Sequence, residues 1–372
     1  MAKNKSKKFL GVIIGIVVIV TAVFYVNIRG TRNKDSEQEK PNVLVLEHKT
    51  GLGVISDYYN EITDKFRKDH PELSFNWISV NSQYDPNVAI SALQQKLALK
   101  RIDLIVTTGE PVTEAVLSFM KGKKIFVLGL FCSGQENIDR SNKEKYHQFF
   151  SADMDEIYEP IADFLKPKVN KIAVLYVADA FGHEAFSTLK KNYIDEDHQI
   201  VFSDMFSIGE LNVRDLVQKT ISFNPEAIVV SGYGAGYENI FRMLKQNQYK
   251  GLVVTDTPAG RMNLYKTTDG ALEGVYFPLM KVDQKKFKDT GVQSYQEMII
   301  YDAFNYIHEA FKNNKEISQE NFQKEEKYSN IVTTYFLPEG KSRVDTQMAI
   351  WKDGKIVPLD TLDNVPTNVQ PE

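Results

Sequence analysis

The chain has 372 residues, of which 42% are hydrophobic and 25% charged, a composition typical of globular proteins with length for about two domains. A formal net charge of −4 gives no basic surface for a polyanion, so we expect no nucleic-acid partner. The single cysteine, Cys132, excludes an intramolecular disulfide and a cysteine-rich metal site.

The amino terminus combines a lysine-rich segment, residues 1–8, with an uncharged apolar run inside residues 9–28. Since about 20 apolar residues cross a bilayer, and no small-residue cleavage site follows, the pattern favours an uncleaved transmembrane signal anchor over a cleaved signal peptide. The lysines predict that residues 1–8 stay in the cytoplasm and that the folded part lies outside, in the periplasm or at the cell exterior. Residues 29–40 are polar and predict a linker.

From Pro41 onward, short apolar runs alternate with stretches of helical periodicity. The expected strands are residues 42–48, 73–81, 103–110 and 124–132, with helices expected over 52–70, 88–99 and 112–122. This alternation predicts βαβ units and a parallel sheet.

A polar stretch, residues 133–148, and a predicted helix over 155–166 separate this array from a second one. The second array has expected strands at 172–177, 198–206, 226–231 and 250–255, with helices between them. Because the binding loops of a parallel sheet lie beyond the carboxyl ends of its strands, loops 179–182, 231–236 and 255–260 are expected to face a ligand.

The pattern changes near the carboxyl terminus. Residues 294–313 predict one long amphipathic helix. The residues between the apolar runs 348–351 and 356–359 include Asp353-Gly354, a turn pair that predicts a β-hairpin and an antiparallel end to the chain.

Six segments in a defined order carry a resemblance: residues 147–165, 171–186, 223–251, 272–278, 301–311 and 348–359. Their order and spacing resemble the type I periplasmic binding proteins, and among them the leucine/isoleucine/valine-binding family of transporter-associated receptors. The resemblance covers most of residues 103–359. It implies an α/β fold of two Rossmann-like lobes with parallel sheets, joined by a three-crossover hinge that closes over a ligand.

The resemblance also implies domain boundaries. Lobe 1 would comprise residues 41–154 plus 281–330, and lobe 2 would comprise residues 155–280 plus 331–362. A polar tail, residues 363–372, would follow.

The family's ligand-binding positions fall, by the same resemblance, on nine residues: Gly109, Glu110, Thr113 and Ser133 in lobe 1, Asp155 at the first crossover, and Phe181, Tyr233, Asp256 and Thr257 in lobe 2. Ser133 suits a ligand carboxylate, which helix N-termini also favour. Glu110 instead adds negative charge where a carboxylate would dock. Thr257 stands where the family has an acid for the ligand's amine, so specificity for α-amino acids does not follow.

Other motifs point to simpler interpretations. Gly232, Gly234 and Gly236 are similar to a dinucleotide fingerprint, but Tyr237 occupies the place of the third glycine, so we expect no nucleotide cofactor. His183-Glu184 begins like a zinc-protease motif, yet Ser187 replaces the second histidine, so we expect no metal.

The function that these patterns favour is a membrane-anchored extracytoplasmic solute-binding protein that delivers a small polar ligand, amino-acid-like or related, to an ABC-type permease. The alternative is a ligand-binding sensor or an assembly subunit of a membrane complex that uses the same fold. An enzyme is disfavoured, because no motif assembles an acid, a base and a nucleophile.

Overall fold

The computed structural model of the chain describes residues 39–50, 54–132, 146–290 and 294–361. The stretch from Pro41 to Glu372 forms a compact unit of its own. The expected membrane anchor at residues 9–28, most of the linker and the tail at 363–372 lie outside the described residues. Within the described part of the chain, no helix has both the length and the apolar character that a membrane span requires.

The first sheet has five parallel strands in the order β2-β1-β3-β4-β5. These are β1 (Asn42–Glu47), β2 (Asn76–Asn81), β3 (Leu104–Thr108), β4 (Phe126–Leu130) and β5 (His147–Phe150), and the connecting helices are α2 (Val54–Asp69), α3 (Pro86–Leu99) and α4 (Glu110–Met120). Strands β3 and β4 are buried along their whole length, as expected of strands covered on both faces. The predicted parallel sheet is thus confirmed.

Strand β5 corrects one expectation. Residues 133–148 were assigned to a polar connection, but His147 and Gln148 begin a strand that pairs with β4. A strand of four residues that opens with two polar side chains gives no apolar periodicity in the sequence. Both side chains are nonetheless buried, because the sheet is covered at this edge too.

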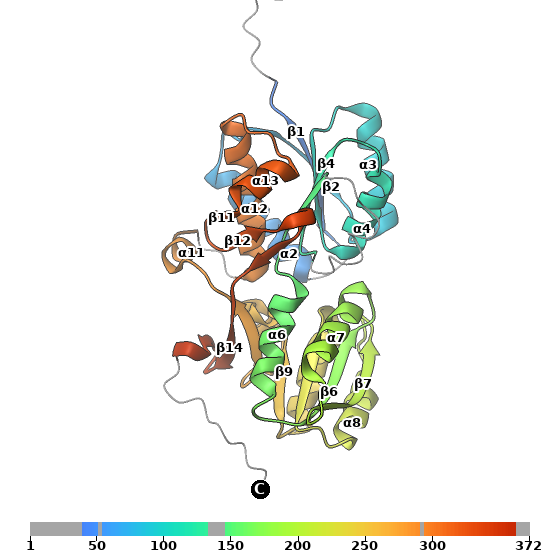
Figure 1. The fold of residues 1–372 in the computed structure, drawn as a ribbon. Coiled ribbons are helices and arrows are strands. Elements are labelled where there is room, and N and C mark those ends of the chain that lie inside the picture. Colours follow the sequence, from blue (N-terminus) through green and yellow to red (C-terminus); the bar gives the residue numbers. More distant parts are fainter. Residues whose placement is uncertain (1–38, 51–53, 133–145, 291–293, 362–372) are drawn as a thin grey trace, which may run out of the picture. The chain divides into compact units, whose positions relative to one another are not determined.

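Helices cover both faces of this sheet. Successive residues of a strand point to opposite faces, so alternate residues of β1 contact different helices. On one face, Leu44 and Leu46 share a core cluster with residues of α3 and α4. On the other, Val43 and Val45 pack with α2 and with a helix from the end of the chain, α12 (Tyr295–Lys312). Phe304 of α12 lies 5.7 Å from Phe66 of α2 between ring centroids, so segments far apart in sequence share one core (Figure 1).

The second sheet has seven strands in the order β15-β14-β10-β9-β8-β6-β7. They are β6 (Lys171–Val177), β7 (Gln199–Phe206), β8 (Ala227–Ser231), β9 (Leu252–Thr255), β10 (Tyr276–Met280), β14 (Thr346–Lys352) and β15 (Lys355–Pro358). The five strands from β6 to β10 run parallel, and β14 and β15 pair antiparallel. Lys352 pairs with Lys355 across a turn whose Asp353 and Gly354 have φ of 53° and 68°, which confirms the predicted hairpin.

The helices of this half are α6 (Met154–Leu165), α7 (Ala180–Tyr193), α8 (Arg214–Ser222), α9 (Gly234–Gln246) and α10 (Met262–Thr267), with the short 3₁₀ turn η1 (Thr257–Gly260). The remaining elements are α11 (Gln284–Thr290), α13 (Gln319–Glu325), η2 (Pro338–Gly340), η3 (Leu359–Thr361), and a small antiparallel sheet of β11 (Lys327–Ser329), β12 (Thr333–Phe336) and β13 (Ser342–Val344).

The chain passes between the two large sheets after β5, after β10 and again between β13 and β14 (Figure 1). The first and third passages are hydrogen-bonded to each other. The Ser151 amide donates to Ser342 Oγ at 3.1 Å, and that hydroxyl donates to the Ser151 carbonyl oxygen at 2.9 Å. Thr346 Oγ1 also donates to the Glu156 carbonyl oxygen at 2.7 Å, so these connections are held as one unit.

Candidate functional site

Aromatic side chains gather just past the carboxyl ends of strands from both large sheets. His48 follows β1, Tyr84 follows β2, and Gly109 lies between β3 and α4. Phe181 follows β6 and Tyr233 follows β8 in the second sheet. In open α/β sheets, ligands bind in the crevice outside the carboxyl ends of the parallel strands.

Tyr84 is the centre of the group on the first sheet. It lies in the turn between β2 and α3, where Gln83 and Tyr84 both adopt positive φ, 54° and 59°. Two successive left-handed residues that are not glycine are uncommon, and here they direct the Tyr84 ring over Gly109. A Cβ atom at Gly109 would lie 2.3 Å from Tyr84 Cε2, and the φ of 80° at this position also favours glycine.

Tyr84 also makes contact with the second sheet's loops. Its hydroxyl lies 3.3 Å from that of Tyr233, and the two rings stand edge to face with centroids 6.2 Å apart. Tyr233 in turn donates a hydrogen bond to Asp179, and Phe181 packs 5.9 Å from the Tyr233 ring. The structure therefore brings together three of the predicted residues, Gly109, Phe181 and Tyr233.

The sequence reasoning did not identify Tyr84 or His48. The one signal at Tyr84 was its place directly before Asp85-Pro86, a helix-start pair that predicts a turn there. His48 is 2% exposed and packs between the rings of Tyr59 and Tyr84, with centroids 5.2 and 5.1 Å away. Burial lowers the pKa of His48 to about 3, so its imidazole is neutral at physiological pH.

The predicted residues of the β3–α4 segment lie deeper than expected. Glu110 opens α4 with only 2% of its surface exposed. Thr113 is fully buried, and its hydroxyl donates to the Gly109 carbonyl oxygen at 2.7 Å and lies 2.8 Å from Thr107 Oγ1. Cys132 lies beside it with Sγ 3.1 Å from Thr113 Oγ1. Thr113 thus stabilises the start of α4 through its hydrogen bond to Gly109. Ser133, another of the predicted residues, lies outside the described residues.

Asp256 directly follows β9 and has a fully buried carboxylate. Ser231 Oγ and the Gly232 amide donate to it at 3.0 and 2.9 Å, and the hydroxyls of Tyr158 and Tyr237 donate at 3.1 and 3.3 Å. Burial raises its pKa to about 6, and the hydrogen bonds oppose part of that rise. Asp256 therefore fixes the Ser231–Gly232 bend that carries Tyr233, while the neighbouring Thr257 is 5% exposed.

Asp155 is not brought to this cluster. It lies in the first turn of α6, with 51% of its side chain exposed and 3.4 Å from the ammonium of Lys191. Lys191 belongs to the last turn of α7, ten residues beyond Phe181. Ten helical residues span about 15 Å, so Asp155 and Phe181 lie at opposite ends of α7.

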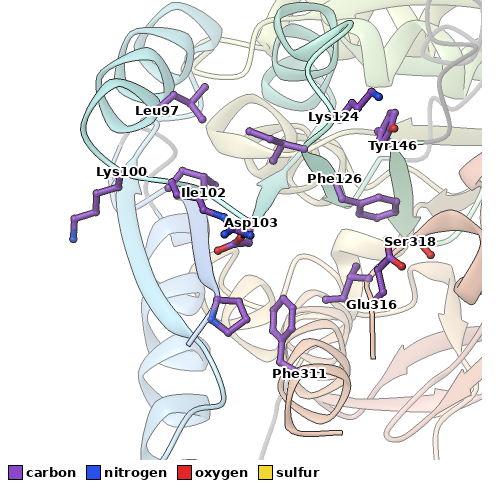
Figure 2. Close-up of a pocket in the computed structure, with 14 residues that line it drawn as sticks. Leu97, Lys100, Ile102, Asp103, Lys124, Phe126, Tyr146, Phe311, Glu316 and Ser318 are labelled. Carbon is purple, nitrogen blue, oxygen red and sulfur yellow. The ribbon is translucent and has the colours of Figure 1, made fainter. Parts of the chain in front are cut away.

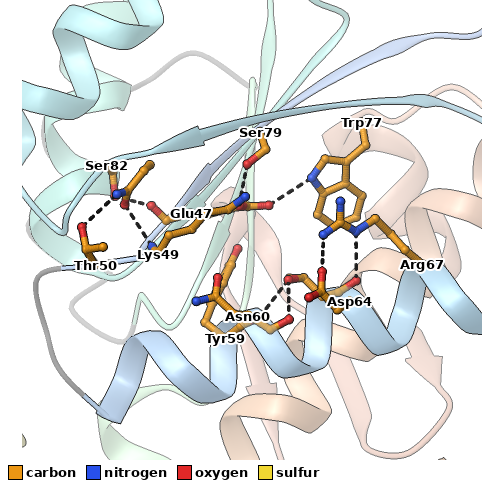
Figure 3. A network of polar contacts seen from close by, with 12 residues as sticks. Glu47, Lys49, Thr50, Tyr59, Asn60, Asp64, Arg67, Trp77, Ser79 and Ser82 are labelled. Atoms are coloured by element: carbon orange, nitrogen blue, oxygen red, sulfur yellow. Dashed lines mark hydrogen bonds and ion pairs between the residues drawn. The ribbon is translucent and has the colours of Figure 1, made fainter.

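Another acid at the end of a strand, Glu47 of β1, has a structural role. Its fully buried carboxylate accepts hydrogen bonds from Trp77 Nε1 at 3.0 Å and Ser79 Oγ at 2.5 Å, and it pairs with Lys49 at 2.9 Å (Figure 3). These contacts tie β1 to β2, so Glu47 is a structural acid.

A hollow of about 650 Å³ lies at the other edge of the first sheet. Its lining includes residues just before β1, β3, β4 and β5, together with the end of α12: Pro41, Leu97, Lys100, Arg101, Ile102, Asp103, Lys124, Ile125, Phe126, Tyr146, Phe311, Glu316, Ile317 and Ser318 (Figure 2). Because it opens at the amino ends of the strands, it is separate from the Tyr84–Tyr233 cluster. The described residues also contain no group of three histidine, cysteine or acidic side chains arranged for a metal ion.

Comparison with solved structures shows the same fold in ligand-binding receptors and in transporter solute-binding proteins. An extracellular ligand-binding receptor from Desulfohalobium retbaense superposes with a TM-score of 0.74 at 14% identity, over 87% of this chain and 60% of that one. The chain thus spans less than two thirds of that receptor. Fuller matches are the LivJ substrate-binding protein of a branched-chain amino acid transporter from Streptococcus pneumoniae in complex with isoleucine (TM-score 0.71, 14% identity, 86% and 98% coverage) and a Rhodopseudomonas palustris ABC-transporter solute-binding protein with p-hydroxybenzoic acid (0.74, 14%, 86% and 95%).

A search of curated proteins found no match to the sequence. A family model described as periplasmic binding protein, however, matches residues 74–349, about three quarters of the chain. That span includes Tyr84, Gly109, Phe181, Tyr233 and Asp256. With its two sheets built largely of parallel strands and its strand-end loops, the chain belongs to the periplasmic binding protein family.

Proposed function

We propose that this protein is a membrane-anchored extracytoplasmic solute-binding protein that captures a small polar ligand between its two lobes and delivers it, unchanged, to an ABC-type permease. The observation that carries the proposal is the contact of Tyr84 with Tyr233, because it joins the strand-end loops of both sheets at one point. A ligand that touches both sets of loops binds the closed arrangement more tightly than the open one. Ligand binding therefore shifts a hinged receptor toward its closed state.

The solved structures with bound isoleucine and p-hydroxybenzoic acid support the ligand-capture part of the proposal. The anchor and the permease rest on the lysine-rich residues 1–8 and the apolar residues 9–28. Intact-mass measurement of the membrane-extracted chain tests the anchor. A mature protein that begins after residue 28 contradicts it.

Thermal unfolding of the full-length chain in detergent, with a library of amino acids, amides, polyamines, sugars and aromatic acids, tests ligand capture. A ligand at about 100 times its dissociation constant adds about 2.7 kcal/mol to the free energy of unfolding and raises the midpoint by a few degrees. We expect Tyr233→Phe to diminish the rise. Tyr249→Phe, which removes a hydroxyl bonded to the Pro225 carbonyl oxygen, is the matched control and should leave it unchanged.

If no compound moves the midpoint of the folded protein, solute capture is wrong. The alternative function, a sensor or an assembly subunit of a membrane complex, would then take its place.

A further inference from the structure

Two helices that begin at the Tyr84–Tyr233 cluster each carry an acid of the protein's own at the amino end. Helix α4 starts at the buried Glu110. Helix α7 is capped by Asp179, which accepts from the Gly182 amide at 2.9 Å and from the Tyr233 hydroxyl. A helix N-terminus favours one nearby negative charge, and here the protein supplies it at both helices.

Two acidic side chains act on the phenol of Tyr84. Burial raises the pKa of its phenol, and the charges of Asp179 and Glu110 raise it further. The groups that act on this phenol include Asp179, Glu110 and Cys132, which raise its pKa, and Tyr233, whose hydrogen bond lowers it. His48, in ring contact with Tyr84, is neutral because burial lowers its pKa to about 3.

Tyr84 also takes up room at the start of α4. A Cβ built on Gly109, the residue that caps this helix, would lie 2.8 Å from the Tyr84 hydroxyl oxygen. The phenol end therefore lies against the helix N-terminus, which otherwise offers backbone amides to an anion. Pro111, the second residue of the helix, has no amide to offer.

The rings around this point suit a different ligand charge. Tyr84, Tyr233, Phe181 and His48 are linked by ring contacts with centroids 5.1 to 6.2 Å apart. Aromatic faces attract cations, and carboxylates form their strongest hydrogen bonds with charged donors. A carboxylate placed among Glu110 and Asp179 is repelled, and such like-charge contacts cost several kcal/mol in an interface.

We propose that this site selects a neutral or cationic ligand over a carboxylate, and that Tyr84 and Glu110 set this preference. The inference rests on the proposed function and narrows its ligand class. It separates this chain from relatives crystallised with isoleucine or p-hydroxybenzoic acid, both of which carry a carboxylate.

Three probes that share a phenol ring and differ in charge test the proposal: tyramine, 4-hydroxybenzamide and 4-hydroxybenzoate. Isothermal titration of the full-length chain in detergent near neutral pH measures each dissociation constant. We expect tyramine or the amide to bind at least about tenfold more tightly than 4-hydroxybenzoate, given the cost of like-charge contacts.

Glu110→Gln removes a negative charge with little change in size, and Tyr84→Ala opens the start of α4. Both substitutions should reduce the ratio between the dissociation constant of 4-hydroxybenzoate and that of the neutral or cationic probe. Tyr249→Phe should leave this ratio unchanged. Equal or tighter binding of 4-hydroxybenzoate by the wild-type chain overturns the inference, and so does a preference that neither variant narrows.

Failure of all three probes to bind also overturns the inference. The proposed function falls only if the wider library fails as well. The wild-type ratio decides the outcome even if a variant does not fold.

Discussion

At the scale of single residues, the start of α4 requires a residue without a side chain at Gly109. Gly109 has φ of 80° and lies under the Tyr84 ring, so any larger residue meets both backbone strain and a steric clash. Gly122, just after α4, has a nearly identical φ of 78° but nothing within 4 Å of its Cβ position. Gly122 therefore shares the positive φ of Gly109 but lacks the contact with an aromatic ring.

We predict that Gly109→Ala lowers the free energy of unfolding more than Gly122→Ala does. Strain alone is worth on the order of 1–3 kcal/mol at either glycine, and the contact with Tyr84 adds to it only at Gly109. Urea unfolding of both variants measures the difference. In a Tyr84→Ala background, Gly109→Ala should cost less than it does in the wild-type background, since the clash is gone, whereas the cost of Gly122→Ala should not change. Equal costs in the wild-type background would refute the steric role of Tyr84.

At the scale of elements, the turn between β2 and α3 is fixed by the helix that follows it. Asp85 caps α3, with Oδ1 accepting from the amides of Asn87 and Val88 at 2.7 and 3.2 Å. The Tyr84 amide also donates to Ser82 Oγ at 3.2 Å. The cap and the turn together hold Tyr84 in its left-handed conformation.

Asp85→Ala should therefore lower the free energy of unfolding by about 1 kcal/mol, the usual cost of losing a helix cap. Asp85→Ser should recover most of the loss, because serine is also a good N-cap. Asp197→Ala, at an exposed acid in the bend before β7, is the control and should change little. Chemical denaturation of the three variants measures these effects, and a loss in Asp197→Ala equal to that in Asp85→Ala argues against a capping role.

At the scale of the whole molecule, buried ionisable groups give stability two opposing dependences on pH. Asp302 of α12 accepts hydrogen bonds from the Val332 and Ile331 amides at 2.8 and 3.2 Å, yet burial raises its pKa to about 7. The Asn330 amide group and the charge of Lys286 also act on it, and both lower the pKa. His48 has the opposite shift, from 6.5 to about 3, caused by burial alone.

The two shifts predict slopes of opposite sign. The folded protein holds a proton on Asp302 that the unfolded chain releases, so this group's contribution to stability is present at low pH and is lost as pH rises from about 4 to about 7. The unfolded chain protonates His48 first, so stability is lost as pH falls from about 6.5 to about 3.

Relative to wild type, Asp302→Asn should gain stability as pH rises from about 4 to about 7, whereas His48→Gln should gain as pH falls from about 6.5. Urea unfolding at several pH values measures both differences. Parallel curves for a variant and the wild type would show that the residue has the same pKa in the folded and unfolded states.

Much of the architecture was predictable because its signals are local. The apolar runs that became β3, β4, β6 and β8, and the helical periodicity between them, specify an alternating α/β chain whatever lies around them. The Asp353-Gly354 turn likewise fixed the final hairpin, since both residues tolerate positive φ. Strand β5 escaped prediction because its burial depends on neighbours that a four-residue stretch cannot indicate.

The site was less predictable than the fold, because it depends on contacts between distant segments. Phe181 and Tyr233 were predictable from their places after strands. The contact of Tyr233 with Tyr84 was not, because it joins turns that are 149 residues apart. Asp155, expected beside the ligand, lies instead near Lys191 at the far end of α7.

By itself, the sequence determined the class of fold and the loops that end its strands, because apolar periodicity and turn chemistry act over a few residues. Only the tertiary structure decided which of those loops meet, that Glu47 and Asp256 are occupied by the fold's own hydrogen bonds, and that Tyr84 covers the start of α4. These outcomes depend on burial and on contacts between distant segments, which arise once the sheets have packed.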